Sequence, residues 1–355
     1  MKNKIDFFVS VLFLMLGVAP RAMSQWVQTG GPYGGNVFAF ATLGTNIFAA
    51  TNCGVYRATD NSANWIAANS GLTDKNPNAF AVLGTRLFTG TSNGGVFVST
   101  DNGANWIGAS AGLNSLSVTC FAVSGANLFV GTYDGVYLST DAGGRWTFVG
   151  DGLSDTPLSA LAVSGSDLYA ATWAGAFLST NNGTTWTAIG LAGMNVNAFA
   201  ISGTNLFAGT SGDVFRSTNR GASWTSTGLT MFTDLSLALS GTSLFAGTYG
   251  GGVFVSTDNG AVWTAMNTGL RSAYVHSLAV VGTTLYAGTV GGGIHVSTDN
   301  GANWDAVNAG LIGTTARRLP SPARISTRAP TAAACLCPPT SACAGRVPRF
   351  PVFTM

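Results

Sequence analysis

One eight-residue motif, repeated seven times at nearly constant spacing, constrains this 355-residue chain more than any other feature. Its general form is Ser-x-Asp-x-Gly-x-x-Trp, and seven of the nine tryptophans lie in it. Successive motif tryptophans are 41, 40, 40, 38, 39 and 41 residues apart. A regular period of this length predicts one supersecondary unit per repeat, with each unit stacked on its neighbours.

The chemistry of the motif predicts a structural role. Its serine hydroxyl and aspartate carboxylate are suited to bonding backbone groups of a turn, and its glycine permits positive φ. The tryptophan is expected to begin an outer strand and pack against the next unit. A calcium loop of the EF-hand kind is disfavoured, because that loop ends in glutamate and the chain contains none. The residues with this expected structural role are Asp60, Trp65, Ser99, Asp101, Gly103, Trp106, Ser139, Asp141, Gly143, Trp146, Ser179, Asn181, Gly183, Trp186, Ser217, Asn219, Gly221, Trp224, Ser256, Asp258, Gly260, Trp263, Ser297, Asp299, Gly301 and Trp304.

Each unit contains four short apolar runs separated by Gly- and Asn-rich turns. In the last unit these runs are residues 277–281, 285–289, 294–298 and 304–308. Such a pattern predicts a four-stranded antiparallel meander, which has the size of one propeller blade. We therefore expect an all-β fold, a β-propeller of four-stranded antiparallel blades, with seven blades and eight as the alternative.

The repeated motif resembles that of the Asp-box (BNR-like) β-propellers. That superfamily includes sialidases, xyloglucanase-type glycoside hydrolases, the sortilin luminal domain and photosystem assembly factors. The resemblance covers residues 26–313 and implies the fold, but not one function, because the same motif serves enzymes and binding proteins. Asn181 and Asn219 replace the aspartate, and the first copy carries Ala58 and Ser62. A neutral asparagine still suits a turn, which favours a structural role.

The N-terminus has the pattern of an export signal. Lys2 and Lys4 precede an apolar stretch at residues 7–19, and Ala22 and Ser24 provide small residues for cleavage. We predict a signal peptide at residues 1–24 and a propeller at residues 25–313, secreted, periplasmic or at the cell surface. An uncleaved membrane anchor is the alternative. Residues 26–30 read as a lone fourth strand that would complete the last blade in competition with residues 304–308.

The C-terminal residues 314–355 break the repeat. Leu311 precedes Leu319 by eight residues, as Leu270 precedes Leu278, so a new unit is due there. A plausible coding sequence for that unit, read one base late, translates as residues 319–340 without a mismatch. We expect a disordered tail that is an out-of-frame eighth repeat, with a genuine Pro/Arg-rich tail as the alternative. Cys335, Cys337 and Cys343 would then form neither a metal site nor disulfides.

Charge and composition exclude several function classes. Residues 25–313 hold seven basic residues and thirteen aspartates, so the body carries about −6 and gives no support to nucleic-acid binding. Cys53 and Cys120 fall in non-adjacent units, which disfavours a disulfide. Sialidase chemistry requires a glutamate base, and the absence of glutamate gives that mechanism no support. The only histidines in the sequence are His276 and His295, and no Ser-His-Asp pattern is visible around them. We expect no cofactor, no metal and no catalytic triad.

The remaining candidates lie on the loops that join strand two to strand three and one blade to the next. In this fold those loops share one face, opposite the motif turns. Their aromatic and carboxylate side chains suit a sugar or a peptide. The residues are Tyr133, Asp134, Asp155, Trp173, Asp234, Tyr249, Arg271 and Tyr274, together with Asp74, Asp151 and His276.

These features favour a bacterial-type secreted propeller that binds a glycan or protein without catalysis, as a monomer. The alternatives are a glycoside hydrolase, in which Asp134, Asp155 or Asp234 would pair as acid and base, and a scaffold within a larger surface protein.

Overall fold

The computed structural model describes residues 35–59, 64–153, 157–230 and 233–311. The expected signal peptide, the lone strand at residues 26–30 and the tail at residues 314–355 lie outside this range, as do Asp60 and Asp155. No helix long and apolar enough to cross a membrane occurs in the described part of the chain.

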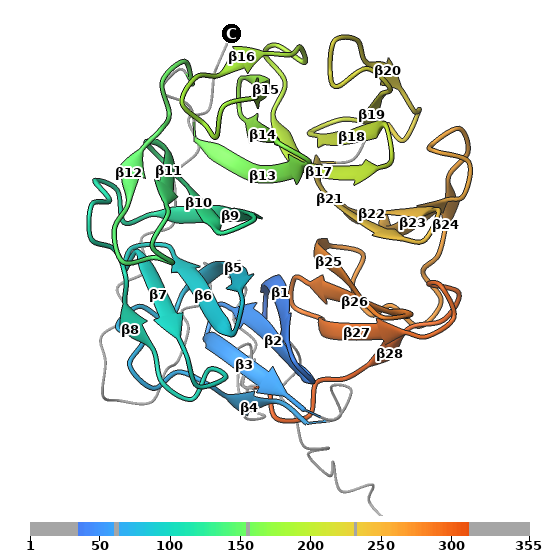
Figure 1. Cartoon of the computed structure of the whole chain (residues 1–355). Coiled ribbons are helices and arrows are strands. Elements are labelled where there is room, and N and C mark those ends of the chain that lie inside the picture. Colours follow the sequence, from blue (N-terminus) through green and yellow to red (C-terminus); the bar gives the residue numbers. More distant parts are fainter. Residues whose placement is uncertain (1–34, 60–63, 154–156, 231–232, 312–355) are drawn as a thin grey trace, which may run out of the picture. The chain divides into compact units, whose positions relative to one another are not determined.

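The described residues form seven antiparallel sheets of four strands each, as expected (Figure 1). Blade 1 is β1 (Val37–Leu43), β2 (Asn46–Thr51), β3 (Gly54–Ala58) and β4 (Ile66–Ala67). Blade 2 is β5 (Pro77–Leu83), β6 (Arg86–Thr91), β7 (Val96–Ser99) and β8 (Ile107–Gly108). Blade 3 is β9 (Val118–Ser124), β10 (Asn127–Thr132), β11 (Gly135–Ser139) and β12 (Thr147–Phe148). Blade 4 is β13 (Leu158–Ser164), β14 (Asp167–Thr172), β15 (Gly175–Ser179) and β16 (Thr187–Ala188). Blade 5 is β17 (Val196–Ser202), β18 (Asn205–Thr210), β19 (Val214–Ser217) and β20 (Thr225–Ser226). Blade 6 is β21 (Thr233–Ser240), β22 (Ser243–Tyr249), β23 (Gly252–Ser256) and β24 (Thr264–Ala265). Blade 7 is β25 (Val275–Val281), β26 (Thr284–Thr289), β27 (Gly293–Ser297) and β28 (Asp305–Ala306).

The first strand of every blade lies innermost, and each contacts the first strands of both neighbouring blades. In the middle of these strands a large residue packs toward the preceding blade and a small residue toward the following one, as β1 illustrates. Phe40, for example, packs against Tyr286 of blade 7 with ring centroids 6.0 Å apart, whereas Ala41 packs toward blade 2. Alternation of large and small residues lets seven sheets interdigitate around one axis.

The motif turn has the same hydrogen bonds in the six copies that the structure describes in full. In blade 2, Ser99 Oγ donates to Asp101 Oδ1 at 2.8 Å and accepts from Gly103 N at 2.8 Å. Asp101 Oδ1 also accepts from Asn105 N at 2.9 Å. Asn102 and Gly103 both have positive φ, 57° and 76°. Asn181 and Asn219 accept the corresponding bonds in blades 4 and 5.

The motif tryptophan packs against the preceding blade, not against the next one as predicted from the sequence. Trp106 N and Trp106 Nε1 of blade 2 donate to Ser70 O and Ala68 O of the linker from blade 1, each at 2.8 Å. That linker crosses over the tryptophan and supplies both carbonyls. The fourth strand is correspondingly only two residues long, shorter than predicted, because the backbone before it bonds to the neighbouring blade.

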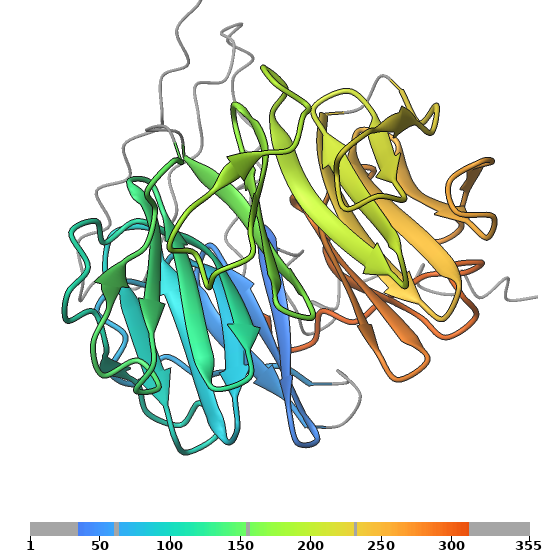
Figure 2. The same ribbon diagram turned by 45° about the horizontal axis from the view of Figure 1, so that its top comes forward.

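The ring closes between blades 7 and 1, where β25 lies beside β1 (Figures 1 and 2). The hydrogen bonds at this junction are of the same kind as those between the other blades. Trp65 N donates to Ala309 O and Trp65 Nε1 to Val307 O, both at 2.8 Å. Ser277 Oγ donates to Val37 O at 3.1 Å across the inner strands. The outer edge of blade 7 is occupied by its own β28.

Candidate binding face

Two faces of the ring differ in chemistry. We call the side formed by the β2–β3-type loops and the blade-to-blade linkers the loop face, and the side formed by the motif turns the motif face. Because each first strand begins and each second strand ends on the loop face, both kinds of connection meet there. All the sequence-predicted site residues that the structure describes lie in these connections or beside them.

Among the described residues, four tyrosine and tryptophan side chains are exposed on the loop face. Tyr133, Trp173 and Tyr249 occupy the equivalent position after the last threonine of strand two in blades 3, 4 and 6, and they are 51%, 49% and 40% exposed. Tyr274, 46% exposed, lies in the linker before β25. Its ring contacts that of Tyr249 with centroids 4.7 Å apart. The structure therefore brings Tyr249 and Tyr274 together, and Tyr133 and Trp173 belong to other blades.

Two of the predicted carboxylates hold loops in place. Asp134 accepts hydrogen bonds from Thr132 Oγ1 at 2.5 Å and Tyr137 Oη at 2.7 Å. Burial, reinforced by Asp134, raises the pKa of Tyr137 to about 12. Asp74 accepts from Asn93 N at 2.8 Å and Gly94 N at 3.1 Å, which fixes the β6–β7 loop. Both carboxylates are therefore already engaged in holding the loops in which they lie.

The other predicted residues are placed as follows. Asp151 is exposed in the linker after blade 3. Asp234 lies in β21, but its side chain is outside the described part, so a pairing of carboxylates involving Asp234 or Asp155 stays a prediction. His276 is exposed at the start of β25 and packs edge-to-face on Phe38 of blade 1, with ring centroids 5.2 Å apart.

Two open cavities occur on the loop face. One, of about 390 Å³, is lined by Arg271, Ser272, Tyr274, Asn308 and the β26–β27 loop. The other, also about 390 Å³, is lined by Met194, Asn195, Phe215 and the β18–β19 loop with Asp213. Asp213 is 7% exposed and accepts from Val214 N at 2.7 Å and from Ser226 Oγ.

Sequence reasoning missed Asp213 and His295. Both break the repeat: His295 stands where the other blades have Tyr or Phe, and Asp213 lies in the one loop of the form Ser-Gly-Asp. Comparing the seven units position by position would have marked them. In the part of the chain that the structure describes, no three His, Cys, Asp or Glu side chains gather as metal ligands. Cys53 lies in the β2–β3 loop of blade 1, and Cys120 is buried in β9 of blade 3.

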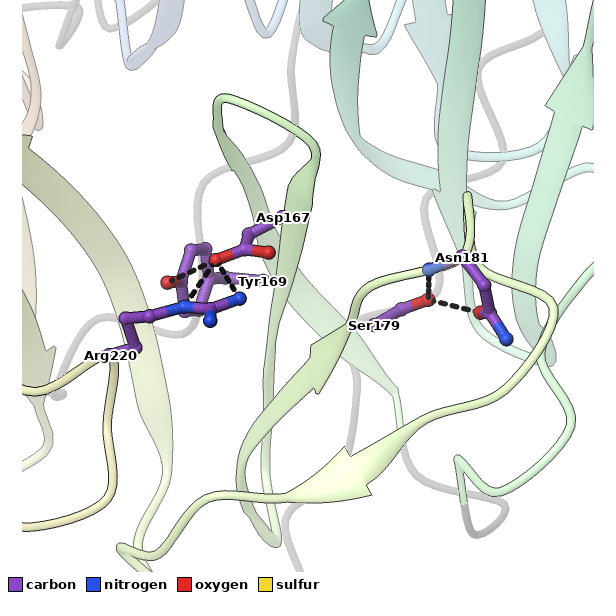
Figure 3. Close-up of polar contacts among 5 residues, drawn as sticks. All are labelled: Asp167, Tyr169, Ser179, Asn181 and Arg220. Carbon is purple, nitrogen blue, oxygen red and sulfur yellow. Dashed lines mark hydrogen bonds and ion pairs between the residues drawn. The ribbon is translucent and has the colours of Figure 1, made fainter.

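The motif face carries an ion pair that joins blades 4 and 5 (Figure 3). Arg220, in the motif turn of blade 5, donates through Nε to Asp167 Oδ2 at 2.6 Å and also forms an ion pair with it. Tyr169 Oη donates to the same carboxylate oxygen at 3.4 Å. Asp167 is 8% exposed. The cluster links two blades, and the motif turn of blade 4, Ser179 and Asn181, lies apart from it.

No protein-family model matches the chain, and no curated protein matches its sequence. Solved structures do match its fold. The extracellular domain of BT4673 from B. thetaiotaomicron superposes with a TM-score of 0.66 at 18% identity, over 75% of this chain and 39% of that one. The GH74 enzyme of Niastella koreensis superposes with a TM-score of 0.65 at 18% identity, over 80% of this chain and 56% of that one. PorZ is a surface component of the type-IX secretion system of Porphyromonas gingivalis. It superposes with a TM-score of 0.59 at 16% identity, over 78% of this chain and 39% of that one.

The chain thus spans about half or less of the length of these structures. Identities at this level establish the fold alone. The chain is a seven-bladed β-propeller that shares its architecture with extracellular domains and with GH74 enzymes.

Proposed function

We propose that this chain is a secreted or surface-exposed, non-catalytic propeller that binds a glycan or protein ligand at the cell exterior through its loop face. The observation that supports this most is the set of exposed tyrosine and tryptophan rings there. Such side chains combine apolar area with a polar group and are enriched at binding surfaces. The extracellular neighbours and the export-signal pattern of residues 1–24 support the location.

We further propose that the chain is an Asp-box propeller. Six described motif turns share one hydrogen-bond pattern, and asparagine takes the place of aspartate in two of them. That tolerance supports a structural role for the motif, which leaves the loop face as the place for function.

The binding proposal is tested by screening the full chain on a glycan array and against extracellular proteins, followed by titration of any ligand found. Trp173→Ala and Tyr249→Ala should each weaken binding by about three- to tenfold, the range expected for loss of one aromatic contact. Ile107→Ala is the matched control, since Ile107 is 68% exposed on the outer strand β8. Binding that is equally insensitive to all three changes would refute a loop-face site.

Glycoside hydrolysis is the second candidate, favoured by the fold shared with GH74 enzymes. It requires two carboxyl groups about 5–10 Å apart. Product release from sialosides or β-glucans that is abolished by Asp155→Asn or Asp234→Asn would establish the hydrolase and refute the non-catalytic proposal.

A further inference from the structure

Blade 7 departs from the repeat at one fully buried position. In β27, His295 pairs with Ala287 of β26, and its side chain is 0% exposed. The residues at the same register in the other six blades are Tyr56, Phe97, Tyr137, Phe177, Phe215 and Phe254. A position that accepts an aromatic ring six times has no packing need for an imidazole.

The imidazole fixes the linker that enters blade 7. His295 Nε2 accepts from Arg271 N at 3.2 Å, so Nδ1 carries the proton of the neutral ring. Among the described residues Nδ1 has no hydrogen-bond partner. A buried N–H without a partner lowers stability, so the fold alone would favour phenylalanine here. In blade 3, Tyr137 Oη accepts from Asn114 N at 3.3 Å, which is the same linker position.

The anchored linker presents Arg271 to the cavity between itself and the β26–β27 loop, which we call the Arg271 pocket. Its walls are Arg271, Ser272, Tyr274, Asn308 and the Val-Gly-Gly segment at residues 290–292. An added Cβ at Gly292 would lie 2.9 Å from Ser272 Cβ and 3.4 Å from His295 Cε1, so His295 lies directly beneath the pocket wall.

The polar groups of the pocket differ in whether they are already used. Asn308 accepts from Ile294 N and donates to Gly292 O, and Ser272 Oγ donates to Val290 O. The exposed Arg271 guanidinium, in contrast, takes part in no ion pair with any described residue. The pocket therefore offers one unused cation, beside the exposed ring of Tyr274 that Tyr249 supports from the side.

We propose that the Arg271 pocket is a subsite for the carboxylate of an acidic, uronate-bearing glycan, with Arg271 as the binding residue and His295 as its positioning residue. The guanidinium fork matches a carboxylate in two parallel hydrogen bonds. The adjacent tyrosine ring suits the face of a sugar. Among the described residues that line it, Val290 is the one aliphatic side chain, so the pocket lacks the group of aliphatic side chains that would anchor an apolar peptide side chain. This subsite rests on the proposed function, because the glycan would be the loop-face ligand.

The test uses the full chain with polygalacturonate and its fully methyl-esterified form as probes, measured by affinity electrophoresis and calorimetry. Wild-type protein should bind the free acid at least about tenfold more tightly than the ester, the difference expected for one charge-assisted contact. Arg271→Ala should remove that preference, and Arg271→Lys should restore part of it. Arg145→Ala is the control, because Arg145 is exposed on the motif face.

His295→Phe separates positioning from stability. It should weaken binding of the acid several-fold while the thermal midpoint at pH 7.5 stays equal to that of the wild type or rises. Loss of binding that only parallels a lower midpoint would refute the positioning role.

Equal affinity for acid and ester, no effect of Arg271→Ala, or Arg271-dependent binding confined to peptides with a free C-terminus would overturn the subsite. In those cases, binding of another ligand that is weakened by Trp173→Ala or Tyr249→Ala would leave the loop-face proposal standing. Binding that is insensitive to both changes would refute the proposed function itself.

Discussion

At the scale of single residues, the seven repeats act as internal controls for one another. A residue that all units share is explained by the structure of the blade, whereas a residue that differs in one unit indicates a role specific to that blade. His295 and Arg220 are two such differences: His295 is buried and polar, and Arg220 is an arginine at a turn position that most other units fill with asparagine. Each is explained by a contact that its counterparts in most of the other units lack, and each leads to a prediction.

His295 should make stability depend on pH. Burial, with a smaller contribution from Arg271, lowers the pKa of His295 to about 4 from its ordinary 6.5. Below pH 6.5 the imidazole is protonated in the unfolded chain but stays neutral in the native protein. The free energy of unfolding should therefore fall between pH 6.5 and 4, by at most about 1.4 kcal/mol per pH unit.

Urea unfolding of the wild type and His295→Phe across that range measures this dependence. The variant should lack the decline contributed by this residue. Phe97→His, at the same register in blade 2, should add a similar decline in the free energy of unfolding at low pH. Parallel curves for the wild type and His295→Phe would contradict a buried neutral imidazole.

The ion pair of blades 4 and 5 should support their interface. Asp167→Asn removes the charge that Arg220 contacts, and it should lower the free energy of unfolding by about 1 kcal/mol, a modest value because Arg220 is solvent-exposed. Raising the ionic strength should reduce the difference in the free energy of unfolding between wild type and Asp167→Asn. Asp305→Asn is the matched control, since its side chain forms no ion pair within the described residues. Equal losses in both variants would argue against a specific interaction.

At the scale of the element, the sequence predicts the blade well because its signals are local. Alternating apolar runs and the glycines of the turns determine strands one to three, and their observed bounds agree with residues 277–281, 285–289 and 294–298 to within a few residues. The fourth strand and the direction of tryptophan packing were less predictable. Both depend on the linker of the preceding blade, whose path is a tertiary feature that periodicity does not encode.

The linker crosses the tryptophan so closely that glycine is required at the crossing. Gly112 has φ +96°, and a Cβ there would lie 2.2 Å from Trp146 O. Gly112→Ala should cost about 2–4 kcal/mol through strain and displacement of the linker. Gly125 also has positive φ, +60°, but a Cβ there would enter open space. Gly125→Ala should therefore lower the free energy of unfolding by only about 1 kcal/mol.

Chemical denaturation of these two variants isolates the close approach from the backbone conformation. Similar losses would show that φ alone accounts for the glycine at the crossing.

At the scale of the whole molecule, the number of blades follows from the count of repeats, but the composition of the loop face does not. Tyr249, at the end of β22, and Tyr274, in the linker before β25, are 25 residues apart in the sequence. They meet because this linker returns to the loop of blade 6. The sequence predicts Asp134 as a candidate binding or acid–base residue, and only the folded loop shows its bonds to Thr132 and Tyr137. Candidate residues are therefore predictable by face, whereas their partners require the assembled ring.

The reading-frame hypothesis for residues 319–340 remains a prediction about the gene. Sequencing the DNA that encodes residues 313–318 should reveal one missing or extra base. An unchanged sequence would mean either a decayed gene or a genuine Arg/Cys-rich tail.

Closure of the seven blades into one ring is the claim on which the loop face depends, and native-state hydrogen exchange tests it most directly. The Trp65 amide bonds to Ala309 O across the closing interface, as the Trp106 and Trp146 amides bond to Ser70 O and Ala111 O within the ring, all at 2.8 Å. If the ring is closed, Trp65 should be protected to within about tenfold of the other two. Exchange of Trp65 at the rate of an unprotected amide, with Trp106 and Trp146 still protected, would show an open ring and contradict the account.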